Sequence, residues 1–495
     1  MAEHPILFVG DLHLGRRPTS LAAALEAAGL TPRQLSPVAA WRRVVDHAQA
    51  TRARAVVLAG DVVDRAKDRF EAYAPLEAGA RALTAAGVPV YAVAGNHDSL
   101  VLPRLAQQVP GVTLVGAGGR WEVVPLSDAP GAGDTAAPGP PVDLLGWSFP
   151  QPHVTEDPTL SPSFREALDG PHRPRRPNAV TLGVVHGDLG ATASHYAPLD
   201  PGRLSHPAVA AWFLGHIHRP SDLDAPPTDG RPLMGYLGSL VGLDAGEPGW
   251  HGAWEVRVDG TVRARRVSLA PARWERLDVP LPPAAADPDA VLDAVRAAVA
   301  RAAAALAPPP AAPAAPSAPA LLAALWRVRL VPAHEVPAVT SNPSAAWAAQ
   351  RAAVRAAAAS LQDDDGNPGP AAYFEAGGVP CVVERLQDDV HPPRAALDLE
   401  ENARLPTPVG WLARQLLALD ALDADAPLPP ALAALTQRAL APLQASAWHP
   451  DETPSPPPRA LLRAAAWRAL ETLVAQRAPA SSSRPAAAPS REGRP

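Results

Sequence analysis

The sequence has a single cysteine, Cys381, and a single lysine, Lys67, among 495 residues. One thiol excludes an intrachain disulfide framework and argues against a structural zinc site, and it is typical of a reducing compartment. No apolar run approaches the roughly 20 residues of a membrane-spanning helix. The N-terminus also lacks a basic segment followed by a long apolar one. We therefore expect a cytoplasmic protein that makes no contact with a membrane.

Aromatic residues are scarce, at 5%, and the formal net charge is −6. An excess of acidic residues argues against a protein that coats nucleic acid nonspecifically, because such proteins are normally basic. A local basic groove is still compatible with this charge. Proline is abundant, with 62 residues gathered in Pro/Ala-rich stretches. Such stretches predict connectors between globular segments, and the length of the chain predicts about two to four domains.

Short apolar runs alternate with amphipathic stretches over the first 270 residues. The runs predict strands at 6–9, 55–59, 89–94, 143–149, 180–185, 212–214 and 233–237. Amphipathic stretches at 39–50 and 73–86 predict helices, and a period of two around Asp259-Gly260 predicts a hairpin. Because the runs are continuous rather than alternating, we expect strands covered on both faces, as in a layered α/β fold. Residues 126–141 read as a flexible surface insertion.

The pattern changes after residue 270. A strand in "RWERLDVPL", a helix at 289–306, a strand in "LWRVRLVP" and a helix at 345–361 predict a small α+β domain, which the stretch "YFEAGGVPCVVERLQ" closes. We expect the first domain to span 1–270 and this α+β domain to span 271–390, with a Pro/Ala-rich linker at 307–320. A helical region is expected at 391–477 and a disordered tail at 478–495. The amphipathic segment 459–474 either packs on its own domain or docks a partner.

Chemically active side chains follow five of the apolar runs, at the carboxyl ends of predicted strands, where α/β sheets bind their ligands. They are Asp11 and His13 in "GDLH", Asp61 in "GDVVD", Asn96, His97 and Asp98 in "GNHD", His186 in "VVHGD", and His216 and His218 in "GHIH". Carboxylates, a carboxamide and imidazoles suit Mn²⁺, Fe²⁺ or Zn²⁺. One such motif is weak evidence, but five in order predict a metal centre.

Two divalent cations need a carboxylate that can bridge them, and Asp61 is the natural bridge. On this scheme one cation takes Asp11, His13 and His218, and the other takes Asn96, His186 and His216. His97 is then free to protonate a leaving alkoxide, with Asp98 as the candidate to orient its ring.

Acids near the motifs and the histidines outside them are not assigned as metal ligands. Asp188 is either a partner of the site or a turn residue. Asp64 is expected to anchor the turn that follows it through backbone N–H groups. Histidines outside the motifs, such as His47 and His153, are expected at the surface.

In this order the motifs resemble those of the calcineurin-like metallophosphoesterases. The resemblance covers 5–269 and implies a four-layered α/β/β/α sandwich with the ligands named above. "DLHLG" and the stretch from Tyr196 through "LGHIH" to "GAWEV" are similar to a narrower branch, the bacterial DNA repair exonucleases of the SbcD and YhaO kind. That branch implies that the phosphoesterase domain is followed by a small capping domain.

This narrower resemblance implies a nuclease that acts on DNA in repair. The two divalent ions are expected to be Mn²⁺, with Mg²⁺, Fe²⁺ or Zn²⁺ as other candidates, and the partner an SbcC-type coiled-coil ATPase. Whether two copies form a homodimer is left open. Two other functions also remain open: a phosphodiesterase for small or cyclic nucleotides, and a mainly structural subunit that organises the ATPase.

Three side chains near the motifs are candidates for contact with DNA. Arg16 and Arg17 follow the first motif closely and either hold backbone phosphates or form a solvated loop pair. Tyr196 either contributes to the substrate site or packs within the fold.

Overall fold

The structure, a computed structural model, describes residues 4–126, 140–170, 176–191, 193–225, 231–282, 285–306, 320–332, 343–388, 399–421 and 458–477, with a few positions between 428 and 438. The predicted insertion 126–141, linker 307–320 and tail 478–495 lie almost wholly outside the described residues. The described chain forms two compact units: Met1–Leu277, Val295–Val328 and Ala358–Leu386 in one, and Asp278–Ala294, Arg329–Ala357 and Gln387–Pro495 in the other.

The first unit contains a six-stranded sheet in the order β13-β12-β1-β2-β3-β4. Its strands are β1 (Ile6–Val9), β2 (Ala55–Ala59), β3 (Val90–Val93), β4 (Val112–Leu114), β12 (Gly252–Val258) and β13 (Val262–Ser268). Strands β1 to β4 run parallel, whereas the β12–β13 hairpin joins β1 antiparallel. The carboxyl ends of β1, β2 and β3 therefore meet at one edge of this sheet.

A second sheet of the same unit has the order β11-β10-β7-β6-β5. Its strands are β5 (Glu122–Pro125), β6 (Val142–Trp147), β7 (Val180–His186), β10 (Ala211–Gly215) and β11 (Leu233–Tyr236). Strands β6, β7, β10 and β11 are parallel, so the ends of β7 and β10 also lie together. A short pair, β8 (Asp188–Leu189) with β9 (Pro198–Leu199), follows β7.

The alternation of side chains along the strands sorts them into separate apolar layers. On β1, Leu7 and Val9 pack toward the helices of the first sheet, whereas Ile6 and Phe8 pack between the two sheets, where Phe8 meets Phe213 with ring centroids 4.2 Å apart. The helices on that outer face are α2 (Pro37–Ala50), α3 (Arg69–Ala85) and α4 (Leu102–Gln108).

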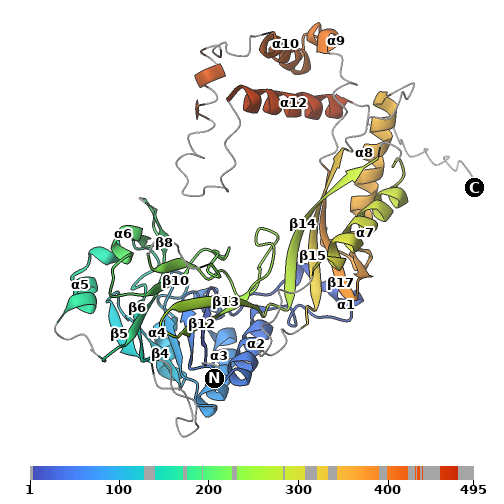
Figure 1. The fold of residues 1–495 in the computed structure, drawn as a ribbon. Coiled ribbons are helices and arrows are strands. Elements are labelled where there is room, and N and C mark those ends of the chain that lie inside the picture. The colour runs from blue at the N-terminus through green and yellow to red at the C-terminus, as the bar shows by residue number, and fades with distance from the viewer. Residues whose placement is uncertain are drawn as a thin grey trace, which may run out of the picture. The chain divides into compact units, whose positions relative to one another are not determined.

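The outer face of the second sheet is covered in turn. There Trp147 and Trp212 pack against Phe164 of α5 (Pro162–Asp169), and α6 (Pro201–Leu204) follows. In Figure 1, α5 and α6 lie on one side of the paired sheets and α2 and α3 on the other. The predicted four-layered α/β/β/α sandwich is therefore confirmed.

The other described elements form a third sheet and further helices. The sheet has the order β14-β15-β17-β16. The elements are β14 (Ala272–Leu281), β15 (Ala323–Pro332), β16 (Tyr373–Ala376), β17 (Val379–Asp388), α1 (Ala22–Ala27), α7 (Pro288–Ala304), α8 (Pro343–Ser360), α9 (Leu399–Ala403), α10 (Pro408–Asp420) and α12 (Pro458–Arg477). Because β14, β15, β17, α7 and α8 each contribute to both compact units, the domain boundaries at 270 and 390 stay predictions.

Within the second unit, α12 packs on α10. Trp467 and Leu470 of α12 are buried together with Val409, Ala413 and Leu416 of α10. The apolar face of the amphipathic segment 459–474 thus has a partner within the chain. Among the described residues no helix is long and apolar enough to cross a membrane.

Candidate metal centre

The predicted ligands gather where the strands of the two large sheets end. Asp11 and His13 follow β1, Asp61 follows β2, Asn96 and His97 follow β3, His186 ends β7, and His216 and His218 follow β10. Asp11, His13, Asp61 and His186 are each at most 2% exposed. The two sheets therefore direct residues from five separate stretches of sequence to one buried place.

The backbone at this place is strained. Asp11, His13, Asp61 and His216 have φ values of +24°, +48°, +47° and +100°, in the region that non-glycine residues avoid. Such conformations cost on the order of 1–3 kcal/mol each and persist only where the surrounding structure imposes them. Strain at four of the predicted ligands marks this edge as a functional site.

Glycine next to the ligands permits their close approach. A Cβ on Gly95 would lie 2.1 Å from Asp61 Oδ1, and one on Gly60, at φ +92°, would lie 2.5 Å from His186 Nδ1. Because no larger residue fits without displacing a candidate ligand, the glycines of "AGD" and "AGNHD" are part of the site.

Asp61 is at the middle of the cluster. Its Oδ2 lies 3.5 Å from His186 Nε2, 4.0 Å from His13 Nε2 and 3.9 Å from His97 Nε2. Burial alone would raise the pKa of the Asp61 carboxyl, but the facing imidazoles of His186, His13 and His97 hold it below its usual range. A charged carboxylate with imidazoles on several sides is what the predicted bridge requires.

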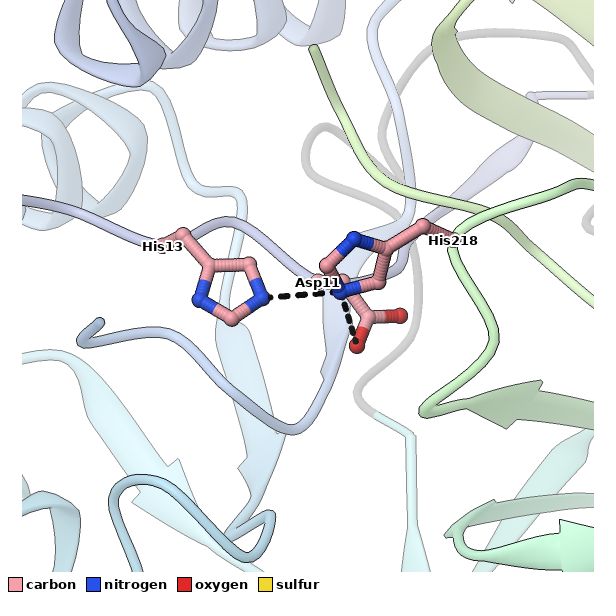
Figure 2. A group of neighbouring side chains, drawn as sticks. All are labelled: Asp11, His13 and His218. Atoms are coloured by element: carbon pink, nitrogen blue, oxygen red, sulfur yellow. Dashed lines mark hydrogen bonds and ion pairs between the residues drawn. The ribbon is translucent and has the colours of Figure 1, made fainter. Parts of the chain in front are cut away.

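Asp11, His13 and His218 form one of the predicted ligand groups. Figure 2 shows the His13 and His218 rings pointing their Nε2 atoms at each other, with the Asp11 carboxylate beside His218. The two Nε2 atoms are 3.0 Å apart. The distance from Asp11 Oδ1 to His218 Nε2 is 3.8 Å. The structure therefore brings these three residues together.

The other predicted group is brought together in part. His186 Nε2 lies 3.0 Å from Asn96 Oδ1, and Asp61 is within reach of the same nitrogen. The His216 ring lies 5.2 Å from that of His186, centroid to centroid. The Nε2 of His216 faces Asp188 at 3.1 Å, so Nδ1 is the nitrogen left for a ligand role.

The donor set fits divalent cations. Three groups of side chains each have ligand atoms within 4.8 Å of one another: Asp11, His13 and His218; His13, Asp61 and His97; and Asp11, Asp61 and His186. The Nε2 atoms of the buried His13 and the partly buried His218 face each other across 3.0 Å, and a bound cation can take both as ligands. Nitrogen and carboxylate oxygen together suit Mn²⁺, Fe²⁺ or Zn²⁺, as predicted.

The nitrogens on the far sides of the rings face oxygen atoms of the protein. His186 Nδ1 lies 3.1 Å from the Ala59 carbonyl oxygen, His13 Nδ1 lies 3.1 Å from Asp64 Oδ1, and His218 Nδ1 lies 2.7 Å from Glu247 Oε1. Such outer contacts decide which ring nitrogen carries the proton. Each ring thereby offers its other nitrogen to the cluster.

The predicted role of Asp98 as the residue that orients His97 is wrong. Asp98 is fully buried, and its carboxylate accepts hydrogen bonds from the backbone N–H groups of Val62, Val63 and Gly95. The chain turns after His97, which directs the next side chain away from that ring. Burial and the charge of Asp61 raise the pKa of Asp98 to about 7. Asp98 supports the loop of Asp61.

Asp64 contacts two of the histidines. Its carbonyl oxygen accepts from His97 Nδ1 at 2.7 Å, while its carboxylate faces His13 Nδ1. The prediction that the Asp64 side chain anchors a turn through backbone N–H groups is therefore wrong, because the imidazole of His13 offers a closer partner. For Asp188, the contact with His216 favours the first of the two predicted roles, a partner of the site.

The candidate DNA contacts lie around this cluster. Arg16 is partly exposed, with its NH1 atom 3.7 Å from Asp64 Oδ1, whereas Arg17 pairs with the exposed Glu71. The Tyr196 ring lies 5.1 Å from that of His216, centroid to centroid. Arg16 and Tyr196 are thus adjacent to ligand-bearing loops, and Arg17 already has a partner.

Glu247 is the residue of the site that the sequence reasoning missed. Burial alone would raise its pKa, but the hydrogen bond and charge of His218 hold it at about 2. The same contact raises the pKa of His218 to about 9, against the effect of burial. Glu247 stands in "DAGEPGWHG", where an acid on a Gly/Pro-rich loop gives no signal of its own.

His47 was expected at the surface and is buried. Its Nε2 lies 2.8 Å from Glu255 Oε1, with His47 on α2 and Glu255 on β12. The helix places this ring against the sheet, because position 47 falls on the apolar face of α2.

Residues 4–220 match the profile of the calcineurin-like phosphoesterase family. Together with the sandwich and the ligand cluster described above, this match shows that this part of the chain has a metallophosphoesterase fold; the members of the matching family are metal-dependent phosphoester hydrolases.

Two curated proteins are similar in sequence to this chain. The chain is 24% identical over 256 residues to the uncharacterized metallophosphoesterase YhaO of Bacillus subtilis, covering 49% of this chain and 55% of that protein. It is 36% identical over 94 residues to the DNA double-strand break repair protein Mre11 of Aeropyrum pernix, covering 19% of this chain and 21% of that protein. The chain thus spans about half of the first relative and a fifth of the second.

Among solved structures, a dimetal phosphatase from Danio rerio matches at 14% identity and a TM-score of 0.31, covering 53% of this chain and 96% of that one. We base no functional conclusion on similarity at this level.

Proposed function

We propose that this chain is a two-cation phosphodiesterase that cleaves DNA, as the nuclease subunit of a repair complex, with Mn²⁺ as its metal. The observation that carries the hydrolytic part is the convergence of imidazole nitrogens and the Asp11 carboxylate around the buried Asp61. Bound divalent cations supply Lewis acidity, which acidifies water and neutralises charge on the phosphate.

The side chains of the site have two proposed tasks, cation binding and proton donation. Asp61, His13 and His186 are buried and His218 is partly buried, and these side chains would hold the cations that neutralise the phosphate. His97 differs from them because its side chain is 44% exposed while its Nδ1 is bound to the Asp64 carbonyl oxygen. Its Nε2 is free of that bond and lies 3.9 Å from Asp61 Oδ2, where a protonated ring can donate to the leaving oxygen.

DNA as the substrate is supported by one relative and by two side chains. The printed name of the Aeropyrum pernix relative is that of a DNA double-strand break repair protein. In this chain the guanidinium of Arg16 lies beside the His13 loop, where it can meet a backbone phosphate, and the ring of Tyr196 lies beside His216.

A comparison of substrates tests this proposal. End-labelled single- and double-stranded DNA and bis-p-nitrophenyl phosphate are incubated with the protein and Mn²⁺, with EDTA as the control. We expect cleavage of DNA and of the small diester, both abolished by EDTA. Hydrolysis of the small diester alone would contradict DNA as the substrate and favour the small-nucleotide phosphodiesterase. No metal-dependent hydrolysis at all would contradict the enzyme and favour a structural role.

The SbcC-type ATPase, the homodimer and the cytoplasmic location stay predictions. In the described second unit, Ala466, Leu470 and Leu473 of α12 pack on α10. An ATPase that docks on this helical pair therefore has to use another face or displace α10.

A further inference from the structure

The loop between β11 and β12 places a carboxylate against one of the candidate metal ligands. Glu247 Oε1 lies 2.7 Å from His218 Nδ1. The other nitrogen of the same ring, Nε2, faces His13 Nε2 at 3.0 Å and Asp11 Oδ1 at 3.8 Å. The outer nitrogen of His218 is thus committed to Glu247, and the inner one to the cluster.

Glu247 is itself held in one orientation. Its Oε2 accepts hydrogen bonds from Ser239 Oγ at 2.9 Å and from the backbone N–H of Leu243 at 3.0 Å. The buried His251 lies behind it, with Nε2 3.1 Å from the Glu247 carbonyl oxygen and Nδ1 2.9 Å from the Ser239 carbonyl oxygen. Both oxygens of the carboxylate are therefore in use, and rotation would break these bonds.

Residues outside the cluster also hold the loop that carries Glu247, through hydrogen bonds to its backbone. Trp274 of β14 donates from Nε1 to the Gly242 carbonyl oxygen at 3.0 Å, and its own carbonyl oxygen accepts from Gly249 N–H at 2.9 Å. Arg276 donates from Nε to the Ala245 carbonyl oxygen at 2.7 Å. These bonds position Glu247 without any contribution from His218.

We propose that Glu247 is the positioning residue that sets the tautomer of His218 and thereby the affinity of the cation held by Asp11, His13 and His218. The inference rests on the proposed two-cation function. A carboxylate can only accept hydrogen bonds, so the proton of a neutral His218 ring stays on Nδ1 and the lone pair of Nε2 is available to the cation.

Glu247→Gln is the sharpest change, because it keeps the shape and reverses this constraint. The amide oxygen can accept from Ser239 and Leu243 as before, which turns the amide NH₂ group toward His218 Nδ1. That nitrogen then has to accept, the ring proton moves to Nε2, and Nε2 no longer offers a lone pair. Loss of such an outer partner weakens metal binding by roughly 10–100-fold.

The test measures Mn²⁺ alone, without substrate, by calorimetric titration and by the electron paramagnetic resonance signal of an exchange-coupled Mn²⁺ pair. Asp244→Asn is the matched control, since Asp244 lies in the same loop and accepts from Gly246 N–H at 2.6 Å without touching His218. We expect wild type and Asp244→Asn to bind two Mn²⁺ and give the coupled signal. Glu247→Gln should keep one tight Mn²⁺ and lose the coupled signal.

Two further variants keep the proposal open to refutation if Glu247→Gln folds poorly. Ser239→Ala removes one bond to Glu247 and should weaken the same Mn²⁺ by a smaller factor. In a His218→Ala background, Glu247→Gln should change Mn²⁺ binding no further, because its effect passes through that ring.

Three outcomes would overturn the role of Glu247. They are wild-type affinity for both ions in Glu247→Gln, an equal loss in Asp244→Asn, and an additional loss in the His218→Ala background. If wild type itself fails to bind two Mn²⁺, the proposed function falls, and the role of Glu247 falls with it.

Discussion

Histidines contact carboxylates in two regions of the first unit, one partly buried and the other buried, and the two contacts differ in the role that they leave to the ring. At the sheet edge, Glu247 holds the outer nitrogen of His218, while the inner nitrogen lies 3.0 Å from His13 Nε2. Between α2 and β12, Glu255 meets His47 with one oxygen and Arg265 with the other, each at 2.8 Å. The second contact neutralises a buried charge, whereas the first orients a ring for another ligand.

A buried histidine–carboxylate pair is therefore weak evidence of a site. Ligand atoms that several strands direct to one place are stronger evidence, because a single ion pair does not require such convergence. The following variants test whether this distinction between the two regions holds.

The largest effect is expected from Asp61→Asn. The amide keeps the volume of the carboxylate but removes the charge at the middle of the cluster. We expect loss of tight Mn²⁺ binding and a fall in phosphodiester hydrolysis beyond the roughly 10²–10⁴-fold that a general acid supplies. Mn²⁺ titration and turnover of bis-p-nitrophenyl phosphate measure both, with circular dichroism to show a folded protein. Hydrolysis at the wild-type rate would show that Asp61 is no bridge.

The next effect is expected from His97→Ala, with a difference between substrates. DNA has a poor alkoxide leaving group that needs a proton, whereas p-nitrophenolate leaves unprotonated. We expect a loss of roughly 10²–10⁴-fold on DNA and a far smaller one on bis-p-nitrophenyl phosphate, with Mn²⁺ binding retained. The matched control is His206→Ala, because His206 pairs with Asp169 away from the cluster. An equal loss on both substrates would make His97 a ligand rather than the acid.

The smallest effect on activity is expected from Glu255→Gln, whose consequence is for stability. Burial alone would raise the pKa of Glu255, but the hydrogen bonds from His47 and Arg265 lower it from 4.5 to about 2. A carboxyl with a depressed folded-state pKa stabilises the protein above its unfolded pKa, and this contribution is lost as pH falls from about 4.5 toward 2. It amounts to at most roughly 3 kcal/mol.

Urea unfolding at pH 7 and near pH 3 measures this contribution. The difference in unfolding free energy between wild type and Glu255→Gln should shrink at the lower pH, while Mn²⁺ binding at pH 7 stays unchanged. Weakened Mn²⁺ binding in Glu255→Gln would mean that the two regions are not separate.

Much of the fold and the site was predictable because the signals are local. The runs at 6–9 and 55–59 coincide with β1 and β2, and the hairpin lies at Asp259-Gly260 as expected. Short or half-exposed strands such as β4 and β5 carry too few apolar residues to be seen, and β8 and β9 are only two residues long.

The predictions for Asp98 and Asp64 were wrong because each side chain has more than one possible hydrogen-bond partner nearby. Asp98 and Asp64 stand near His97 in sequence or in space, and the sequence does not say which of them turns toward the ring. The backbone N–H groups of Val62 and Val63 bind Asp98, which leaves the Asp64 carbonyl oxygen for His97. Only the fold decides this competition.

By itself, the sequence determined the layered α/β class and the candidate ligands. Each apolar run is followed directly by its acids or imidazoles, so this signal is local in the sequence. The tertiary structure decided which atom each ring uses. His218 and Glu247 are separated by 29 positions, and their 2.7 Å contact exists because β14 and Ser239 hold the intervening loop in one shape. A hydrogen bond depends on distance and angle, and no spacing along the chain encodes either between residues brought together by packing.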